Sequence, residues 1–208
     1  MKIAGPNTDK QWAALKKRLE SEPSQRLWDL AFRRFYRMRI DTRYLFPIAS
    51  IHRHDTCLGE GFAICTLFCS LIEFLESCER GYNFHYVPRG GALLHYEYDQ
   101  KQASSYFKDF LKTRKPFSTL VPPKLVDSFY RDVRCGLVHE AQTKSGWVLS
   151  SVPRSNALIS QQGTQITLFR NSLIPALEEY FLDYRRRLLT CQSTQQAFIR
   201  KFDHLCKA

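Results

Sequence analysis

The stretch that decides the fold is residues 61–81, GFAICTLFCSLIEFLESCERG. From about Glu60 to Cys78 apolar side chains cover nearly every side of a helix, and such a helix belongs at the centre of a bundle. The segment also contains Glu73 and Glu76 and ends in charge, so we predict a buried core helix and not a membrane span. A carboxylate in these surroundings is destabilising unless it is paired. We therefore expect Glu73 either to lie at an exposed edge or to meet an Arg or His from another helix.

Helical patterns flank this stretch on both sides. Thr8 or Asp9 can cap a first helix that runs to about Ser21. Pro23 suits the first turn of a second helix, which we expect to end near Arg39. After the central helix, apolar periodicity predicts four more helices, at about 102–114, 124–141, 172–189 and 193–205.

Three segments lack helical periodicity. We expect residues 41–58 to be irregular, and the turn-rich, aromatic residues 81–99 to form a loop or a short strand pair. Residues 146–169 place β-branched and apolar residues between Pro, Asn and Gly, which predicts a small hairpin or short strands. The fold class is therefore all-α, a helix bundle with a small β-hairpin insert.

The composition points to an anionic partner. The chain has 31 Lys and Arg against 20 Asp and Glu, a net charge of +11, which favours RNA or DNA ahead of a membrane surface. A protein that is simply basic remains the alternative. The second helix has the densest basic face, which is either solvated or an RNA contact: Arg26, Arg33, Arg34, Arg37 and Arg39.

The cysteine and histidine residues predict no disulfide framework, metal or cofactor. Seven cysteines without a CxxC pair, mostly in apolar surroundings, suit reduced thiols in the cytoplasm. The N-terminus has no apolar signal-peptide region. His52, His54, Asp55 and Cys57 lie close together, but their spacing matches no familiar zinc pattern.

The segment 129–141, FYRDVRCGLVHEA, is unusual for a helix of the core. Val126, Tyr130, Val133 and Leu137 form one core stripe of the helix 124–141. Asp132 and His139 are seven residues apart, so a regular helix places them within about 20° of each other on a second stripe. Gly136 lies between them, where glycine costs about 1 kcal/mol against alanine. Close approach by another backbone, a partner helix or a ligand would explain it.

Arg134, four intervening residues and His139 resemble the Arg–(four to six residues)–His motif of HEPN domains. The setting is also similar, because the motif lies on a late helix of an all-α bundle, after an apolar helix ending in IEFLE. The resemblance covers roughly residues 58–205 and implies a HEPN-like bundle over 58–208, with residues 1–57 as an N-terminal helical extension. Cys135 follows Arg134 where the family commonly has a polar residue, whereas Asp132 follows Arg131. Which arginine is catalytic therefore stays open.

What the resemblance implies is a metal-independent endoribonuclease that acts as a homodimer, with both motifs lining one cleft. In this interpretation His139 is general base or acid and Arg134 stabilises the charged transition state. Arg131 binds RNA, and Asp132 or Glu73 orients a charged partner. The weaker candidates for supporting roles are Tyr130 and Glu140.

Other functions remain open. The first alternative is a non-catalytic HEPN-like module for RNA binding or dimerisation, in which His139 is a helix-end histidine satisfied by a carbonyl. A DNA-binding regulator is disfavoured, because no helix-turn-helix with a recognition helix is visible. The partners expected are RNA and a second copy of the chain, without a membrane. The resemblance further allows an antitoxin or other regulatory protein, in a toxin or phage-defence role.

Overall fold

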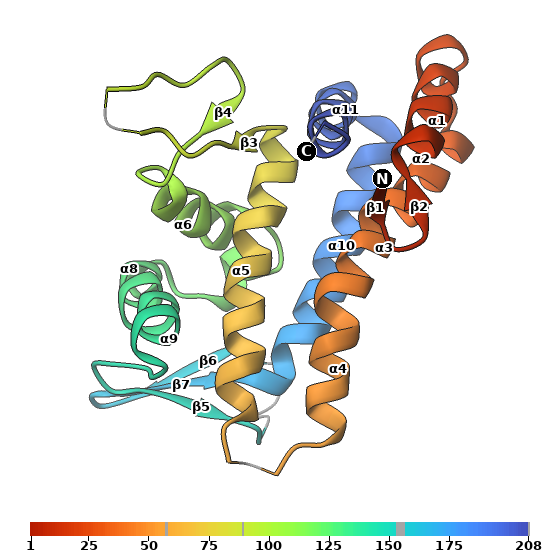
Figure 1. Ribbon diagram of the computed structural model, residues 1–208. Coiled ribbons are helices and arrows are strands. Elements are labelled where there is room, and N and C mark those ends of the chain that lie inside the picture. The colour runs from red at the N-terminus through yellow and green to blue at the C-terminus, as the bar shows by residue number, and fades with distance from the viewer. Residues whose placement is uncertain (57, 89, 153–156, 208) are drawn as a thin grey trace. The chain divides into compact units, whose positions relative to one another are not determined.

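The computed structural model describes residues 1–56, 58–88, 90–152 and 157–207 (Figure 1). It is mostly helical with small sheets, which confirms the predicted fold class. The chain groups into two compact units. Unit 1 comprises Met1–Pro47, Phe74–Ala103 and Leu182–Ala208, and unit 2 comprises Ile48–Glu73 and Ser104–Phe181. This grouping does not follow the predicted boundary at residue 57.

Two long helices belong partly to each unit. These are α5 (Glu60–Arg80) and α10 (Leu173–Thr190). By length and composition α5 could cross a membrane, but 56% of its most apolar window is buried. Leu71, Ile72 and Leu75 are inaccessible to solvent. This burial pattern is the one predicted for a core helix.

Unit 1 begins with a short antiparallel pair, β1 (Lys2–Ala4) and β2 (Asn7–Thr8), which the sequence did not indicate. Helix α1 (Asp9–Ser21) follows, and Thr8 and Gln11 form a capping box at its start. Its apolar stripe packs on α11 (Gln192–Leu205), where the Trp12 ring lies 5.8 Å from that of Phe198. The first and last helices predicted from the sequence are thus confirmed, and they form one core.

The next helix is longer than predicted. Helices α2 (Gln25–Ala31), α3 (Met38–Ile40) and α4 (Phe46–Arg53) are joined without a break by the π-helical segments η1 (Phe32–Arg37) and η2 (Asp41–Leu45). The prediction that residues 41–58 are irregular is therefore wrong as far as Arg53. Proline usually ends a helix, but Pro47 is the second residue of α4, just after the π-helical segment η2, where the hydrogen-bond spacing changes and a missing N–H is tolerated.

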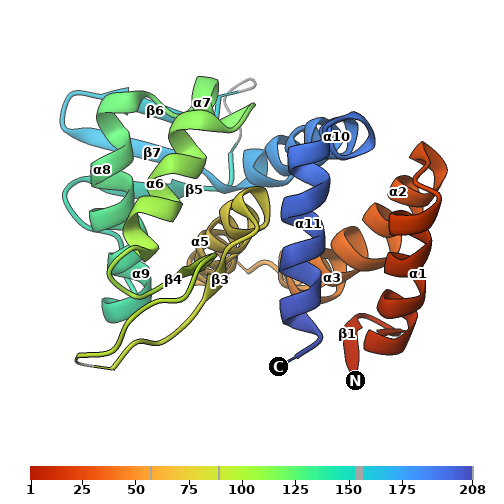
Figure 2. The ribbon, with the colours of Figure 1, turned by 90° about the horizontal axis from the view of Figure 1, so that it is seen from above.

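The aromatic segment 81–99 contains the predicted short strand pair. Strands β3 (Asn83–Phe84) and β4 (Glu97–Tyr98) pair in parallel. Helix α11 lies between this segment and α1 (Figure 2). Lys201 of α11, which is 5% exposed, donates to the Tyr82 carbonyl at 3.0 Å, and burial lowers its pKa.

In unit 2 the helix that carries the Arg134–His139 motif, here called the motif helix, lies between another helix and a small sheet. Helices α6 (Ala103–Thr113) and α7 (Phe117–Leu120) lead to the motif helix, which consists of η3 (Pro123–Leu125), α8 (Val126–Ser128), η4 (Phe129–Arg134) and α9 (Cys135–Glu140). Phe129 lies 5.7 Å from the Phe107 ring of α6 on one side and 5.3 Å from Trp147 of the sheet on the other. The motif helix is thus held between two packed layers.

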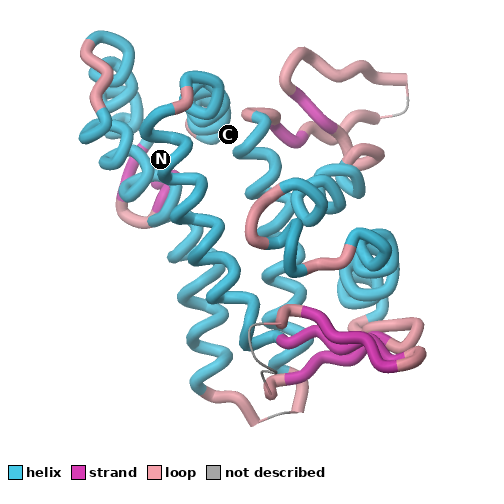
Figure 3. The backbone as a smooth tube through the Cα atoms, turned by 180° about the vertical axis from the view of Figure 1, so that it is seen from behind, coloured by secondary structure: helices cyan, strands magenta, loops and turns pink. Residues whose placement is uncertain are grey.

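The predicted strands form a three-stranded sheet, drawn in magenta in Figure 3. Strand β7 (Gln165–Phe169) lies in the middle, parallel to β5 (Trp147–Ser150) and antiparallel to β6 (Ile159–Gln162). A short 3-10 turn, Arg170–Ser172, then leads into α10. The small β insert is therefore confirmed.

Arg170 is a buried cation of unit 2. Its side chain is 5% exposed, and one terminal nitrogen contacts the Asp55 carboxylate while the other, Nη1, has no hydrogen-bond partner among the described residues. Its stem covers Gly61, where an added Cβ would lie 3.2 Å from the Arg170 Cδ. This ion pair ties the segment before α5 to the end of β7.

Asp55→Ala is expected to lower the free energy of unfolding by about 3–5 kcal/mol, because it leaves a buried guanidinium without a counter-charge. Urea unfolding measures the loss. Asp127→Ala is the control, since Asp127 pairs with Lys108 at 2.8 Å but is 66% exposed, and it should change stability little. Equal effects of the two substitutions would show that the Arg170 pair contributes no more than a surface pair.

Candidate functional site

The motif helix is not a regular α-helix. In η4 the Cys135 N–H donates to the Tyr130 carbonyl, five residues earlier, which defines a π-helical turn that includes Arg134, the first residue of the motif. Such turns occur frequently at functional sites. Val126, Val133 and Leu137 are buried as predicted, whereas Tyr130 is only half-buried. The π turn shifts the register on which the predicted stripes depended.

Arg134 forms an ion pair with Glu73 of α5. Its Nε lies 2.9 Å and its Nη2 2.8 Å from the same carboxylate oxygen, Oε1. The two side chains are 20% and 19% exposed. Glu73 therefore meets an arginine from another helix, one of the two outcomes expected from the sequence.

Burial shapes the electrostatics of this pair. It raises the pKa of Glu73, and the Arg134 charge and hydrogen bond only partly oppose the shift. Burial also acts to lower the pKa of Arg134, but Glu73 and Tyr130 outweigh it, so that this pKa is raised. The Tyr130 ring lies 5.6 Å from the Arg134 Cζ, and burial raises the pKa of its hydroxyl. Arg134 is thus held as a cation in a fixed place.

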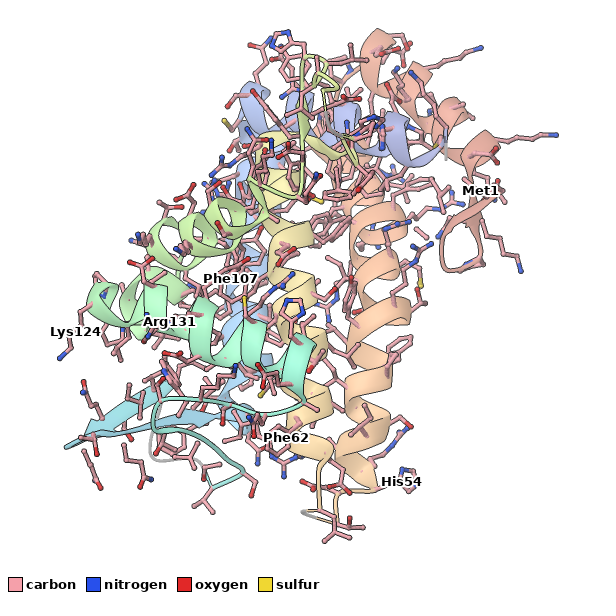
Figure 4. All side chains as sticks on the ribbon, turned by 60° about the vertical axis from the view of Figure 1, so that its left-hand side comes forward. Met1, His54, Phe62, Phe107, Lys124 and Arg131 are labelled. Atoms are coloured by element: carbon pink, nitrogen blue, oxygen red, sulfur yellow. The ribbon has the colours of Figure 1, made fainter. Side chains whose placement is uncertain are left out.

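Arg131 and Asp132 pair with each other. The Arg131 Nε and Nη2 lie 2.9 Å and 2.6 Å from the two Asp132 oxygens, and the Arg131 side chain, labelled in Figure 4, is 68% exposed. Asp132 is buried and also accepts from the Ser145 hydroxyl at 3.2 Å. These hydrogen bonds, that of Arg131 first, lower its pKa. Asp132 therefore anchors the turn before β5, and Glu73 is the carboxylate that orients Arg134.

His139 lies in the last turn of α9 and is exposed. Within the described residues its ring makes no hydrogen bond, so the alternative of a carbonyl-satisfied histidine finds no partner there. Its neighbour Glu140 pairs with Lys144, which lowers the Glu140 pKa. A regular helix would place Asp132 and His139 on one stripe, but their exposure differs: Asp132 is buried and His139 is accessible.

Gly136 permits the chain to reverse. An added Cβ would lie 2.5 Å from the Gln142 carbonyl oxygen. Ala141 adopts a left-handed conformation (φ 53°), and the Gln142 N–H donates back to the Gly136 carbonyl at 3.3 Å. The predicted close approach is confirmed, and the approaching backbone is the chain's own segment after the helix.

Lys108 of α6 is a neighbour that sequence reasoning missed. Its Nζ lies 5.4 Å from the centre of the Tyr130 ring, so this ring has two cations near it. Only the packing of α6 on the motif helix brings Lys108 there, and no spacing in the sequence signals it.

Metal ligands and disulfides are not found in the described part of the chain. No group of three or more His, Cys, Asp or Glu side chains is placed to hold a metal ion there. His54 contacts the Ser50 carbonyl, Asp55 pairs with Arg170, and Cys57 lies outside the described residues. Cysteines 65, 69, 78, 135, 191 and 206 are free thiols.

No family model, curated protein or solved structure matches this chain.

Gly136→Ala is expected to destabilise the protein by about 1–3 kcal/mol, because the added methyl group meets a carbonyl oxygen, although helix propensity alone favours alanine by about 1 kcal/mol. Thermal and urea unfolding measure the change. Gly59→Ala is the control, since nothing lies within 4 Å of a Cβ at that position. If Gly136→Ala proved stabilising, the close approach of residue 142 would be refuted.

Arg134→Ala is expected to lower the free energy of unfolding by about 2 kcal/mol, between the values for exposed and buried pairs, because Glu73 loses its cation. Adding Glu73→Gln should recover part of this loss, since the remaining side chain is neutral. A double-mutant cycle by urea unfolding measures the coupling. Strictly additive effects would mean that the two side chains do not stabilise each other.

Proposed function

We propose that this protein is a metal-independent endoribonuclease of the HEPN type that acts as a homodimer in the cytoplasm. The observation that carries the proposal is the motif geometry: Arg134 is fixed by Glu73, and the accessible His139 follows on the same helix. The resemblance of the Arg134–His139 spacing to the HEPN motif supplies the reaction class.

The chemistry follows from these groups. A His139 imidazole removes the proton from a ribose 2′-hydroxyl, and the oxygen attacks the adjacent phosphorus. The bond from phosphorus to the 5′-oxygen breaks, and a protonated imidazole, which the partner subunit's motif supplies in the proposed dimer, returns a proton to that oxygen. The products are a 2′,3′-cyclic phosphate and a 5′-hydroxyl.

The guanidinium stabilises the charge that develops on the phosphate. Glu73 engages Nε and Nη2 of Arg134, so donors on the outer side of the fork remain for phosphate oxygens. Arg131, which is held by Asp132 and well exposed, adds a binding contact in this proposal. Tyr130 and Glu140 have supporting roles, as neighbours of Arg134 and His139.

The second candidate is a non-catalytic module for RNA binding or dimerisation. It is favoured by the Arg134–Glu73 pair itself, because a guanidinium already neutralised by a carboxylate is a weaker catalyst. Such a module would retain the positive charge and tolerate loss of His139. An antitoxin or other regulatory partner, and a toxin or phage-defence role, fit either candidate.

Incubation of the purified protein with mixed RNA in EDTA tests the proposal. Cleavage with cyclic-phosphate ends is expected, and His139→Ala should slow it by about 10²–10⁴-fold because the proton transfer is lost. His52→Ala is the matched control, an exposed histidine outside the site. Glu73→Gln with Arg134→Gln removes the guanidinium without stranding a charge, and should also abolish cleavage. RNA binding without cleavage, or cleavage that survives His139→Ala, would favour the second candidate or a contaminant.

A further inference from the structure

The positive charge is concentrated in the unit that lacks the motif. Unit 1 has 20 Lys and Arg and 11 Asp and Glu residues, a net charge of +9 out of +11. Unit 2, which carries Arg134 and His139, has 11 against 9, a net charge of +2. A polyanion is therefore attracted mainly by unit 1.

A groove on unit 1 collects part of this charge. It has a volume of about 630 Å³ and lies where the last turn of α1 meets α2 and η1. Three arginines line it together with Leu27, Leu30 and Glu22: Arg18, Arg26 and Arg33. Arg26 of α2 and Arg33 of η1 belong to one continuous helix, and both side chains line the groove.

The groove keeps excess positive charge after ion pairing. Arg33 lies 3.0 Å from Asp29, but the same carboxylate also binds Arg185 at 2.6 Å, so one charge serves two guanidinium groups. Arg18 and Arg26 are exposed and have no acidic partner within the described ranges. Glu22 in the groove wall offsets one of these charges, and the site remains cationic.

We infer that this groove binds the phosphate backbone of RNA, so that binding in unit 1 and cleavage in unit 2 are divided within one chain. The inference rests on the proposed function for its choice of RNA. Guanidinium forks match phosphate oxygens, and a groove accommodates a strand. A membrane surface fits less well, because the groove's leucines are not among the exposed large apolar side chains and an interfacial helix needs an exposed apolar face.

The test is binding of a fluorescent 2′-O-methyl RNA, which cannot be cleaved, over a range of salt concentrations. The variant is Arg18→Ala with Arg26→Ala and Arg33→Ala. The matched control removes three exposed lysines of unit 2, with Lys112→Ala, Lys115→Ala and Lys124→Ala; Lys124 extends into solvent in Figure 4. We expect the arginine variant to bind about tenfold more weakly and its salt slope to fall by about 2, since each lost phosphate contact removes about 0.7. The lysine variant should change affinity less than about threefold.

Two further measurements, of unfolding temperature and of vesicle binding, distinguish a loss of RNA contacts from unfolding and from membrane binding. Asp29 still binds Arg185 in the arginine variant, so unfolding temperatures should match the wild type. Should they not, Arg18→Ala with Arg26→Ala provides the same test, because it breaks no ion pair between described residues. Equal weakening by the arginine and lysine variants overturns the inference. So does a loss of binding to phosphatidylserine vesicles without a loss of RNA binding.

The failure of this inference and that of the proposed function give different results. If the groove binds RNA, the arginine variant should raise the KM for RNA cleavage and leave kcat unchanged, whereas His139→Ala should lower kcat. If the arginine variant binds RNA as tightly as the wild type and cleavage still depends on His139, the RNA-binding role of the groove is refuted and the nuclease proposal stands. If the arginine variant binds RNA more weakly and neither the wild type nor any variant cleaves RNA, the nuclease proposal is refuted and the RNA-binding role of the groove stands.

Discussion

A carboxylate on the apolar helix α5 needs a counter-charge, and Arg134 provides it for Glu73. Both side chains are about four-fifths covered, so they interact in surroundings less polar than water, where attraction between charges is stronger and an unpaired charge more destabilising. The contact joins α5 to the π-helical turn in which the motif begins. It fixes the position and protonation of the one motif arginine that lies partly inside the protein, and the candidate site is built around it.

The charged residues of the motif helix have different partners. Asp132 and Arg134 are two residues apart and therefore point to different sides of the helix: Asp132 is buried against the turn before β5, and Arg134 reaches α5. Gly136 then allows the chain to fold back on the end of the helix. His139 is left at the accessible end of this anchored segment, where an imidazole can exchange protons with a bound molecule.

The division of charge between the two units bears on how a nucleic acid would be held. In unit 2 most charged side chains near the motif are matched in pairs: Arg134 with Glu73, Arg131 with Asp132, and Lys144 with Glu140. In unit 1 the arginines of the α1–α2 groove outnumber the carboxylates close to them. The net charge of the sequence is a property of the whole chain. The difference in net charge between the two units appears only when distant segments of the sequence are grouped by their packing.

The sequence by itself determined most of the helices, the cap of the first one at Thr8, the strands within 81–99 and 146–169, and the need of Glu73 for a partner or an exposed edge. Hydrophobic periodicity and local turn chemistry are properties of neighbouring residues, so they can be read along the chain. It also singled out Gly136 as a position of close approach. It failed at residues 41–53, where polar residues and Pro47 conceal a helix that continues through π-helical segments.

Tertiary structure alone decided which charges pair, that Lys108 lies beside Tyr130, and that residues 1–47 group with 74–103 and 182–208. These contacts join residues far apart in the chain. Glu73 and Arg134 are separated by 61 positions, and many arginines could have satisfied the same carboxylate. Only the packing of α5 against the motif helix selects one of them.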